Sequence, residues 1–98
     1  MAAVGKSLVF WEASREARGD GRIVRLDPRE AALLLALDKY GGASIETLAV
    51  LVFGRQVDRI TVGQYVLRLR RKLGRRRIVS IPKLGYRLSG KLERRLSR

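Results

Sequence analysis

The sequence predicts an α+β fold with a small N-terminal antiparallel sheet, three helices and a C-terminal β-hairpin. Three observations support this prediction. Two β-like runs open the chain, helix start and stop signals follow in pairs, and a basic amphipathic segment then leads into a short ribbon. The chain has 98 residues, which is enough for one modest core and too few for two. We therefore expect a single domain over residues 1–98.

The N-terminal sheet is expected within residues 7–26. Ser7–Glu12 and Arg22–Leu26 are rich in β-forming residues, and a Gly-Asp-Gly cluster between them supplies turn chemistry. The polar stretch between the two runs can add a weak middle strand. Phe10 and Trp11 could stack on nucleic-acid bases, but core packing is the favoured interpretation at strand positions.

Capping signals define the first helix, which is expected over residues 28–40. Asp27 can accept hydrogen bonds at the N-terminus, and Glu30 completes the spacing of a capping box. The helix ends where Gly41 can adopt the left-handed conformation of a C-terminal cap. Three leucines on one side of this helix should lie in the core: Leu33, Leu34 and Leu37.

The second helix is short and is expected over residues 45–53. Ser44 is its candidate N-cap, and Gly54 follows its last residue. Three of its apolar side chains are predicted to be buried: Leu48, Leu51 and Val52.

The third helix is expected over residues 59–73 and has two opposite faces. Asp58 is a candidate N-cap, and Gly74 follows the helix. At about 100° per residue, four apolar residues fall on one side: Val62, Val66, Leu69 and Leu73. Four polar residues fall almost directly opposite: Gln64, Arg68, Arg71 and Arg75. One face can therefore pack against the protein while the other offers guanidinium groups to a partner.

A β-hairpin is expected over residues 78–88, with strands Ile78–Ile81 and Tyr86–Leu88 around a turn that contains Pro82 and Gly85. Residues 89–98 form a basic tail without a clear structural pattern. Strands, three helices and a terminal hairpin make the layout of a winged helix-turn-helix, in which the second helix braces the third.

The charge of the chain is high and unevenly distributed. The formal net charge is +13. Residues 1–53 contain seven basic and seven acidic side chains, so all of the excess lies in residues 54–98. Residues 59–77 hold eight basic groups and no acid, whereas an ordinary solvated helix mixes both signs to form ion pairs. This concentration of one sign indicates an anionic polymer as partner.

The composition argues against an enzyme, a metal site or a cofactor site. The chain has no Cys and no His, so the usual thiolate and imidazole ligands and the usual general base are missing. We expect no catalytic residue, no metal and no cofactor. The apolar runs are too short to span a membrane and the start lacks the apolar middle of a signal peptide. We therefore expect a cytoplasmic protein that contacts no membrane.

An ordered set of motifs resembles a known family. In chain order the set is Leu26-Asp27-Pro28-Arg29-Glu30, Leu34, Leu37, Gly41, Ser44, Leu48, Val52-Phe53-Gly54, Thr61-Val62, Val66, Leu69-Arg70-Arg71-Lys72-Leu73 and Ser80-Ile81-Pro82-Lys83-Leu84-Gly85-Tyr86-Arg87-Leu88. Over residues 8–88 the chain resembles the OmpR/PhoB-type winged-helix effector domain of bacterial transcription regulators, including response regulators. The resemblance implies a four-stranded N-terminal sheet, three helices and a hairpin wing.

The chain departs from the family pattern at several positions. Phe53 stands where the family usually has Trp, Gly63 where an acidic residue is frequent, and Tyr65 where His is frequent. Pro82-Lys83 replaces the Arg-Gly that many wings carry. This wing sequence is more similar to the ToxR/CadC-like branch, whose members are often membrane-anchored. The resemblance therefore does not carry over the signalling of either branch.

The resemblance implies a role for each matching position. Base readout in the major groove is implied for Arg68, Gln64 and Gly63, and chemistry agrees because Arg pairs with guanine and Gln with adenine. Contacts to the DNA backbone are expected from Thr61, Arg70, Arg71, Lys72, Arg75, Arg76, Arg77, Ser80 and Tyr86. Lys83 at the wing tip is a candidate for the adjacent minor groove, although a solvated turn lysine is an equal alternative. The loop that can meet RNA polymerase in activators of this type corresponds to Gly54, Arg55, Gln56, Val57 and Asp58.

The function expected from the sequence is sequence-specific binding of double-stranded DNA as a transcription regulator. RNA polymerase and a second copy on direct-repeat DNA are the further partners that the resemblance implies. Two alternatives remain open. The same charge would suit an RNA- or nucleoid-binding protein without sequence readout, and some winged helices bind proteins instead of DNA.

Overall fold

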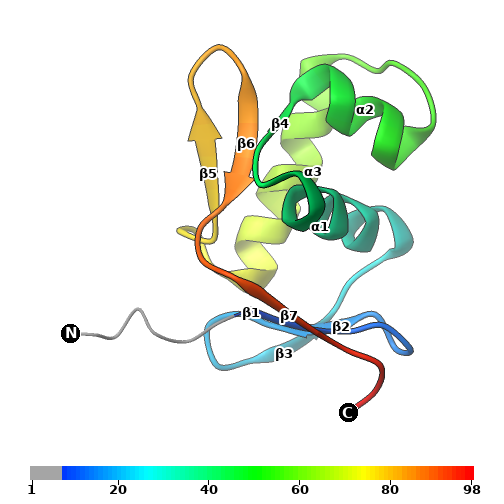
Figure 1. The fold of residues 1–98 in the computed structure, drawn as a ribbon, viewed down its shortest axis with the longest axis vertical. Coiled ribbons are helices and arrows are strands. Elements are labelled where there is room, and N and C mark those ends of the chain that lie inside the picture. Colours follow the sequence, from blue (N-terminus) through cyan, green and yellow to red (C-terminus); the bar gives the residue numbers. More distant parts are fainter. Residues whose placement is uncertain (1–7) are drawn as a thin grey trace.

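The computed structural model describes residues 8–98. Ser7, the first residue of the predicted opening strand, lies outside the described residues. Figure 1 shows a sheet at one end of the molecule, three helices above it and a hairpin beside them. The elements in chain order are β1 (Leu8–Trp11), β2 (Glu16–Arg18), β3 (Ile23–Arg25), α1 (Pro28–Tyr40), β4 (Ala43–Ser44), α2 (Ile45–Phe53), α3 (Arg59–Leu73), β5 (Ile78–Ile81), β6 (Gly85–Leu88) and β7 (Leu92–Arg95).

The sheet at the base has the order β3-β2-β1-β7. Its first three strands are antiparallel neighbours, as the sequence predicts, including the weak middle strand. The fourth strand corrects two expectations, because it comes from the C-terminal tail and runs parallel to β1. The sheet is therefore neither wholly N-terminal nor wholly antiparallel. Pairing with β7 satisfies backbone groups on the second edge of β1, which would otherwise be exposed.

The central position of β1 explains its burial. Phe10 and Trp11 are 2% and 3% exposed, so neither aromatic ring is available to stack on a base. Leu8 and Phe10 belong to the main core, whereas the guanidinium groups of Arg18 and Arg98 lie over the ring of Trp11. The interpretation of these aromatics as packing residues is confirmed.

Helices α1 and α2 begin and end where their capping residues predict. Asp27 accepts a hydrogen bond from the Glu30 backbone N–H, and the Glu30 carboxylate accepts one from the Asp27 N–H, which completes the capping box. Ser44 caps α2 through the Thr47 N–H. Leu33, Leu34, Leu37 and Leu48 are buried. The prediction for Leu51 is wrong, since it is 43% exposed, and Val52 is only partly buried.

Helix α3 packs its apolar side against the rest of the protein. Val62, Val66, Leu69 and Leu73 are at most 1% exposed, which confirms the predicted stripe. At its C-terminal end, α3 lies close to the turn that follows β2. A Cβ atom added to Gly19 would lie 2.0 Å from the Leu73 carbonyl oxygen, so only glycine fits at this contact.

The hairpin is part of a second sheet with the order β4-β6-β5. Strand β4, which the sequence analysis did not predict, pairs with β6. The pairing depends on Gly85, because a Cβ there would lie 2.0 Å from the Ala43 carbonyl oxygen. The wing is thus fixed along one side to the segment between α1 and α2.

Candidate nucleic-acid interface

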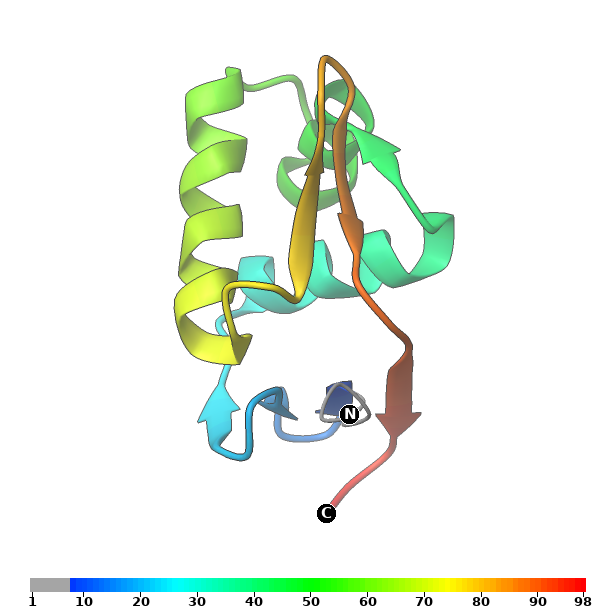
Figure 2. The same cartoon turned by 90° about the vertical axis from the view of Figure 1, so that its left-hand side faces the viewer.

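The outward side of α3 carries exposed basic residues, and α3 contains no acidic residue. In Figure 2, α3 stands along one edge of the molecule, and no other element lies beyond it on that side. Gln64, Arg68 and Arg71 are exposed there, while the opposite side of the same helix is buried. The predicted separation of an apolar and a polar face is confirmed within α3. Arg75 was expected on the polar face but lies outside the helix, in the turn that follows Gly74.

The basic residues near the end of α3 fall into two groups. Three are exposed, and within residues 8–98 their side chains have no hydrogen-bond or ion-pair partner. We call these the free cations: Arg71, Arg75 and Arg76. Their guanidinium groups remain available for an anionic partner.

Three others are bound to the protein itself, and we call these the held cations: Arg70, Lys72 and Arg77. Arg70 donates to the Ile78 carbonyl and to the Ser80 hydroxyl, both at 3.1 Å, and so fastens α3 to the wing. Arg77 donates to the Gly19 carbonyl at 2.8 Å and lies 3.5 Å from the carboxylate of Asp20.

Lys72 is the most firmly bound of the held cations. Its ammonium group donates to the Glu30 carboxylate at 2.6 Å and to the Arg25 carbonyl at 2.9 Å. The Glu30 side chain is only 2% exposed, so Lys72 supplies the positive charge that balances a buried carboxylate. This ion pair joins α3 to the start of α1.

Arg68 has an intermediate position. Its side chain is half exposed, at 50%, and lies 3.6 Å from the Asp27 carboxylate. Its guanidinium group also lies 4.5 Å from the ring centre of Tyr65, which packs edge-on against Phe53. Asp27 and Tyr65 therefore hold Arg68 at the edge of the exposed side of α3 through contacts that are individually weak.

The N-terminus of α3 is ordered by Asp58 and Thr61. The Asp58 carboxylate accepts hydrogen bonds from the Thr61 backbone N–H at 2.8 Å and from its hydroxyl at 2.7 Å. These bonds hold the pKa of Asp58 below its ordinary value. Gly63 follows on the side of the wing, where a Cβ would come within 3.8 Å of the Tyr86 hydroxyl. Gly63 thus lies where α3 and the wing meet.

The wing presents Lys83 at its tip. Pro82 and Lys83 are the central residues of a turn closed by a bond from the Leu84 N–H to the Ile81 carbonyl. Lys83 has φ 63°, a left-handed conformation that normally favours glycine. Ser80 is exposed on the wing, and Tyr86 is half-buried with its ring beneath Arg70.

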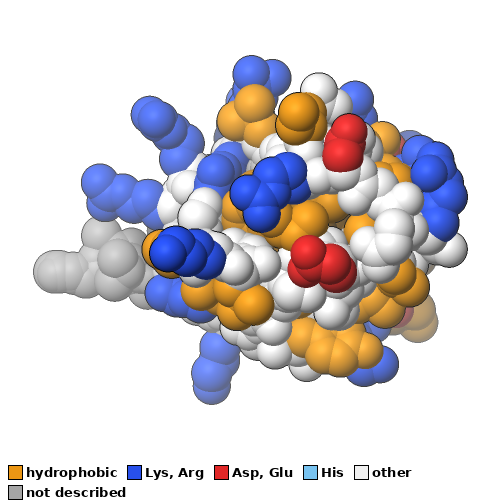
Figure 3. Space-filling view, turned by 90° about the horizontal axis from the view of Figure 1, so that it is seen from above, with side chains coloured by type: hydrophobic (Ala, Val, Ile, Leu, Met, Phe, Trp, Pro, Cys, Tyr) orange, Lys and Arg blue, Asp and Glu red, His pale blue; other side chains and the backbone are white. Residues whose placement is uncertain are grey.

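The loop between α2 and α3 lies at the same end of the molecule as the wing turn. Gly54, Arg55, Gln56 and Asp58 are exposed, whereas Val57 packs against the core. Figure 3 views this end and shows Lys and Arg side chains around much of its outline, with acidic side chains in isolated positions.

Two apolar side chains on the exposed side of α3 were missed by the sequence analysis. Ile60 is 68% exposed and Leu67 is 45% exposed. They are seven residues apart, so they lie on the same side of the helix, next to Gln64 and Arg71. The helical periodicity could have revealed them, since neither fits the buried stripe.

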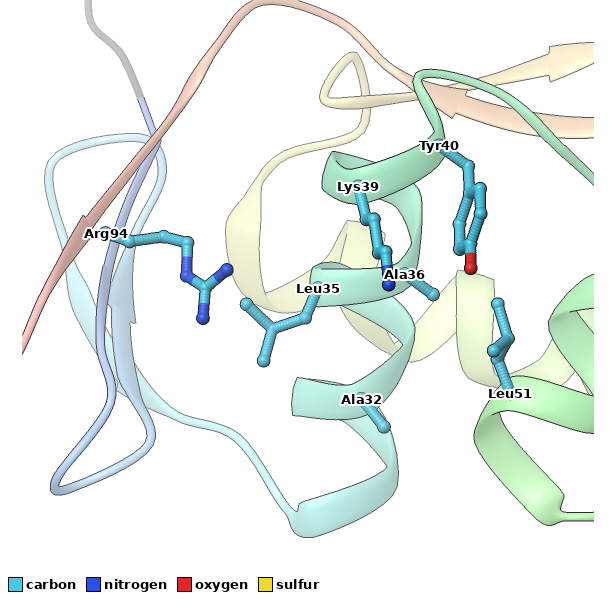
Figure 4. Close-up of a pocket in the computed structure, with 7 residues that line it drawn as sticks. All are labelled: Ala32, Leu35, Ala36, Lys39, Tyr40, Leu51 and Arg94. Atoms are coloured by element: carbon cyan, nitrogen blue, oxygen red, sulfur yellow. The ribbon is translucent and has the colours of Figure 1, made fainter.

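A shallow groove of about 510 Å³ lies elsewhere, between α1, α2 and β7. Figure 4 shows its lining: Ala32, Leu35, Ala36, Lys39, Tyr40, Leu51 and Arg94. The lining holds two cations, one phenol and aliphatic groups, and no carboxylate. Residues 8–98 hold no group of three or more side chains suited to a metal ion. None of the described helices is both long and apolar enough to span a membrane.

The fold matches solved DNA-binding domains. The structure of the DNA-binding domain of Bacillus subtilis CssR is similar with a TM-score of 0.71 and 30% identity, over 85% of this chain and 100% of that one. The DNA-binding domain of Escherichia coli CadC has a TM-score of 0.68 and 28% identity, over 79% of this chain and 80% of that one.

The DNA-binding domain of the response regulator AdeR, solved in complex with an intercistronic region, has a TM-score of 0.71. It is 16% identical, over 87% of this chain and 96% of that one, and so it supports the fold alone. No family model and no curated protein sequence matches the chain. The winged-helix architecture, the ordered motifs and the 30% identity over a complete CssR domain together show that the chain belongs to the OmpR/PhoB-type family of DNA-binding domains.

Proposed function

We propose that the protein binds double-stranded DNA sequence-specifically as a transcription regulator. Helix α3 enters the major groove, and the wing contacts the adjacent backbone and minor groove. The observation that carries this proposal is the division of α3 into a buried apolar face and an exposed face that carries Arg68 and Arg71, with the free cations Arg75 and Arg76 in the turn that follows. The AdeR domain, which has the same fold, was solved in complex with an intercistronic region.

The structure suggests a narrower set of contacts than the sequence did. Arg68 and Gln64 are the base readers, and the free cations bind phosphates together with Ser80 and Tyr86. Thr61 orders the start of α3, because Asp58 already accepts from its hydroxyl and its N–H. Arg70 positions the wing relative to α3. Lys72 and Arg77 serve the fold, because their donors are already used by Glu30, Arg25, Asp20 and Gly19.

Lys83 is proposed to contact DNA from the wing tip. A non-glycine residue with positive φ costs free energy, and a glycine would fit this turn without that cost. Lysine in this conformation puts a cation at the exposed turn of the wing. This observation favours the functional interpretation of Lys83 over that of a solvated turn lysine.

Two further partners follow from the family. The exposed loop 54–58 is proposed to contact RNA polymerase, and two copies are proposed to bind side by side on direct repeats. Both proposals place the protein with the chromosome, in the cytoplasm.

The experiment that tests the function is selection of bound duplexes from a random library at two salt concentrations, followed by affinity measurements with Arg68→Ala. We expect the selection to enrich a sequence motif. Arg68→Ala should weaken binding by roughly 1–3 kcal/mol and abolish the preference at one base pair of that motif. The matched control is Arg22→Ala, an exposed arginine just before β3, which should leave the motif and the affinity unchanged.

Other outcomes would identify the alternatives. If Arg68→Ala weakens all duplexes equally and no motif is enriched, the protein binds nucleic acid without readout, and the affinity should then depend almost wholly on salt. If no duplex is bound even in dilute buffer, the proposed function is wrong and a protein partner becomes the explanation.

A further inference from the structure

The exposed face of α3 carries an apolar row beside its polar one. We call Ile60 and Leu67 the apolar row. Ile60 and Leu67 are 68% and 45% exposed, so the row is open to solvent although α3 has a well-filled buried face. At 1.5 Å per residue, the two side chains are about 10 Å apart along the helix.

The neighbours of this row define its surroundings. Gln64 and Arg71 lie on the same side of α3, three or four residues from Leu67, and both are exposed. On its other flank, Leu67 is followed three residues later by Arg70, which is bound to the wing. Leu67 therefore lies between the proposed base reader Gln64, the free cation Arg71 and the wing.

From this arrangement we infer that the apolar row, and Leu67 above all, reads the 5-methyl group of thymine. This inference rests on the proposed function and adds a specificity-determining contact to it. In the major groove the thymine methyl is the only apolar group on the edge of a base pair, and it distinguishes A·T from the other pairs at that position. An aliphatic side chain recognises it by excluding water from both groups.

The position of Leu67 on the helix makes the contact geometrically reasonable. Leu67 lies about one turn after Gln64 and roughly 60° from it around the helix, on the side away from Arg68, so it extends the groove-facing surface that begins at Gln64. Leucine offers no hydrogen bond, so its only means of discrimination at this place is the methyl group. A purely electrostatic face would not require an aliphatic side chain there.

The test replaces thymine by deoxyuridine, one position at a time, in a duplex obtained from the selection described above. Uracil lacks only the methyl group, so hydrogen bonding and charge are unchanged. We expect a three- to fivefold loss of affinity at one position of the motif, the effect of one buried methyl group. With Leu67→Ala the same replacement should cause no loss.

Leu51→Ala is the matched control, because Leu51 has a similar exposure of 43% but lies on α2 and not on the exposed side of α3. It should keep the full sensitivity to uracil. Equal affinity of wild-type protein for every uracil-substituted duplex would overturn the inference while leaving the proposed function intact, as would an unchanged uracil penalty with Leu67→Ala. A failure of the wild-type protein to bind any duplex would instead contradict the proposed function itself.

Discussion

The held cations and the free cations come from the same stretch of sequence, yet the fold uses them differently. Lys72 and Arg71 are neighbours, and both are basic. Lys72 donates to a buried carboxylate of α1, whereas Arg71, about 100° away around the helix, is exposed to solvent. The comparison shows that the net charge of a segment overstates the number of cations available to a partner, because some of these cations stabilise the protein instead.

The difference also explains how a strongly basic helix remains stable without a ligand. Like charges close together on a helix destabilise it. Here Arg70 and Arg77 donate to backbone carbonyls of the wing and of the turn after β2, and Lys72 pairs with Glu30. These contacts offset part of the repulsion. Only the free cations remain available to bind phosphates.

The largest effect is expected from a held cation. Lys72→Met should lower the free energy of unfolding by roughly 2 kcal/mol, because it leaves the Glu30 carboxylate buried without its counter-charge. This value is below the usual range, since the Lys72 side chain is 35% exposed and partly screened by water. Urea denaturation measures the change.

Arg71→Met is the matched control for that substitution. It removes a cation from the next residue, but from the exposed face, and should change the stability by less than about 0.5 kcal/mol. Equal stabilities of the two variants would break the distinction between held and free cations.

The wing tip should show the opposite combination of effects. Lys83→Gly removes a side chain from a left-handed residue and should raise the free energy of unfolding by up to about 1 kcal/mol. The same change should weaken DNA binding, because the cation at the tip is lost. A variant that is more stable and binds as tightly as wild type would show that Lys83 is only a solvated turn residue.

Arg68 is intermediate between the held and the free cations, because it is half exposed but lies near the Asp27 carboxylate. Removing the charge of Asp27 should make the Arg68 guanidinium group more available to DNA. Asp27→Asn keeps a good N-cap for α1 but removes the charge that faces Arg68 at 3.6 Å. We expect a two- to threefold gain in affinity for DNA, in line with the small value of an exposed ion pair. In an Arg68→Ala background the gain should shrink; a gain of the same size there would mean that Asp27 acts on DNA directly.

Most of the fold could be predicted because its signals are local. The three helices begin at Asp27, Ser44 and Asp58, whose side chains cap them, and the glycines that follow each helix mark its end. The buried stripe of α3 follows from the helical period alone. Such features depend on residues only a few positions apart, so the sequence displays them directly.

What could not be predicted depends on contacts between distant residues. Strand β7 has the sequence Leu-Glu-Arg-Arg, which lacks an apolar alternation, and it forms because β1 offers an edge to pair with. The role of Lys72 depends on Glu30, 42 residues earlier. Leu51 was expected in the core because α2 is apolar on most sides, and only the packing of its neighbours decides which side is covered.

The most direct test of the account is the salt dependence of DNA binding with all three free cations changed to alanine. Each lost phosphate contact should reduce the slope of log K against log salt concentration by about 0.9, so the variant should lose about 2.7 in slope. The Lys72→Met protein, measured under conditions where it is folded, should keep the wild-type slope. An unchanged slope for the triple variant, or an equal loss for Lys72→Met, would contradict the claim that the outward face of α3 and the turn after it form the surface that binds DNA.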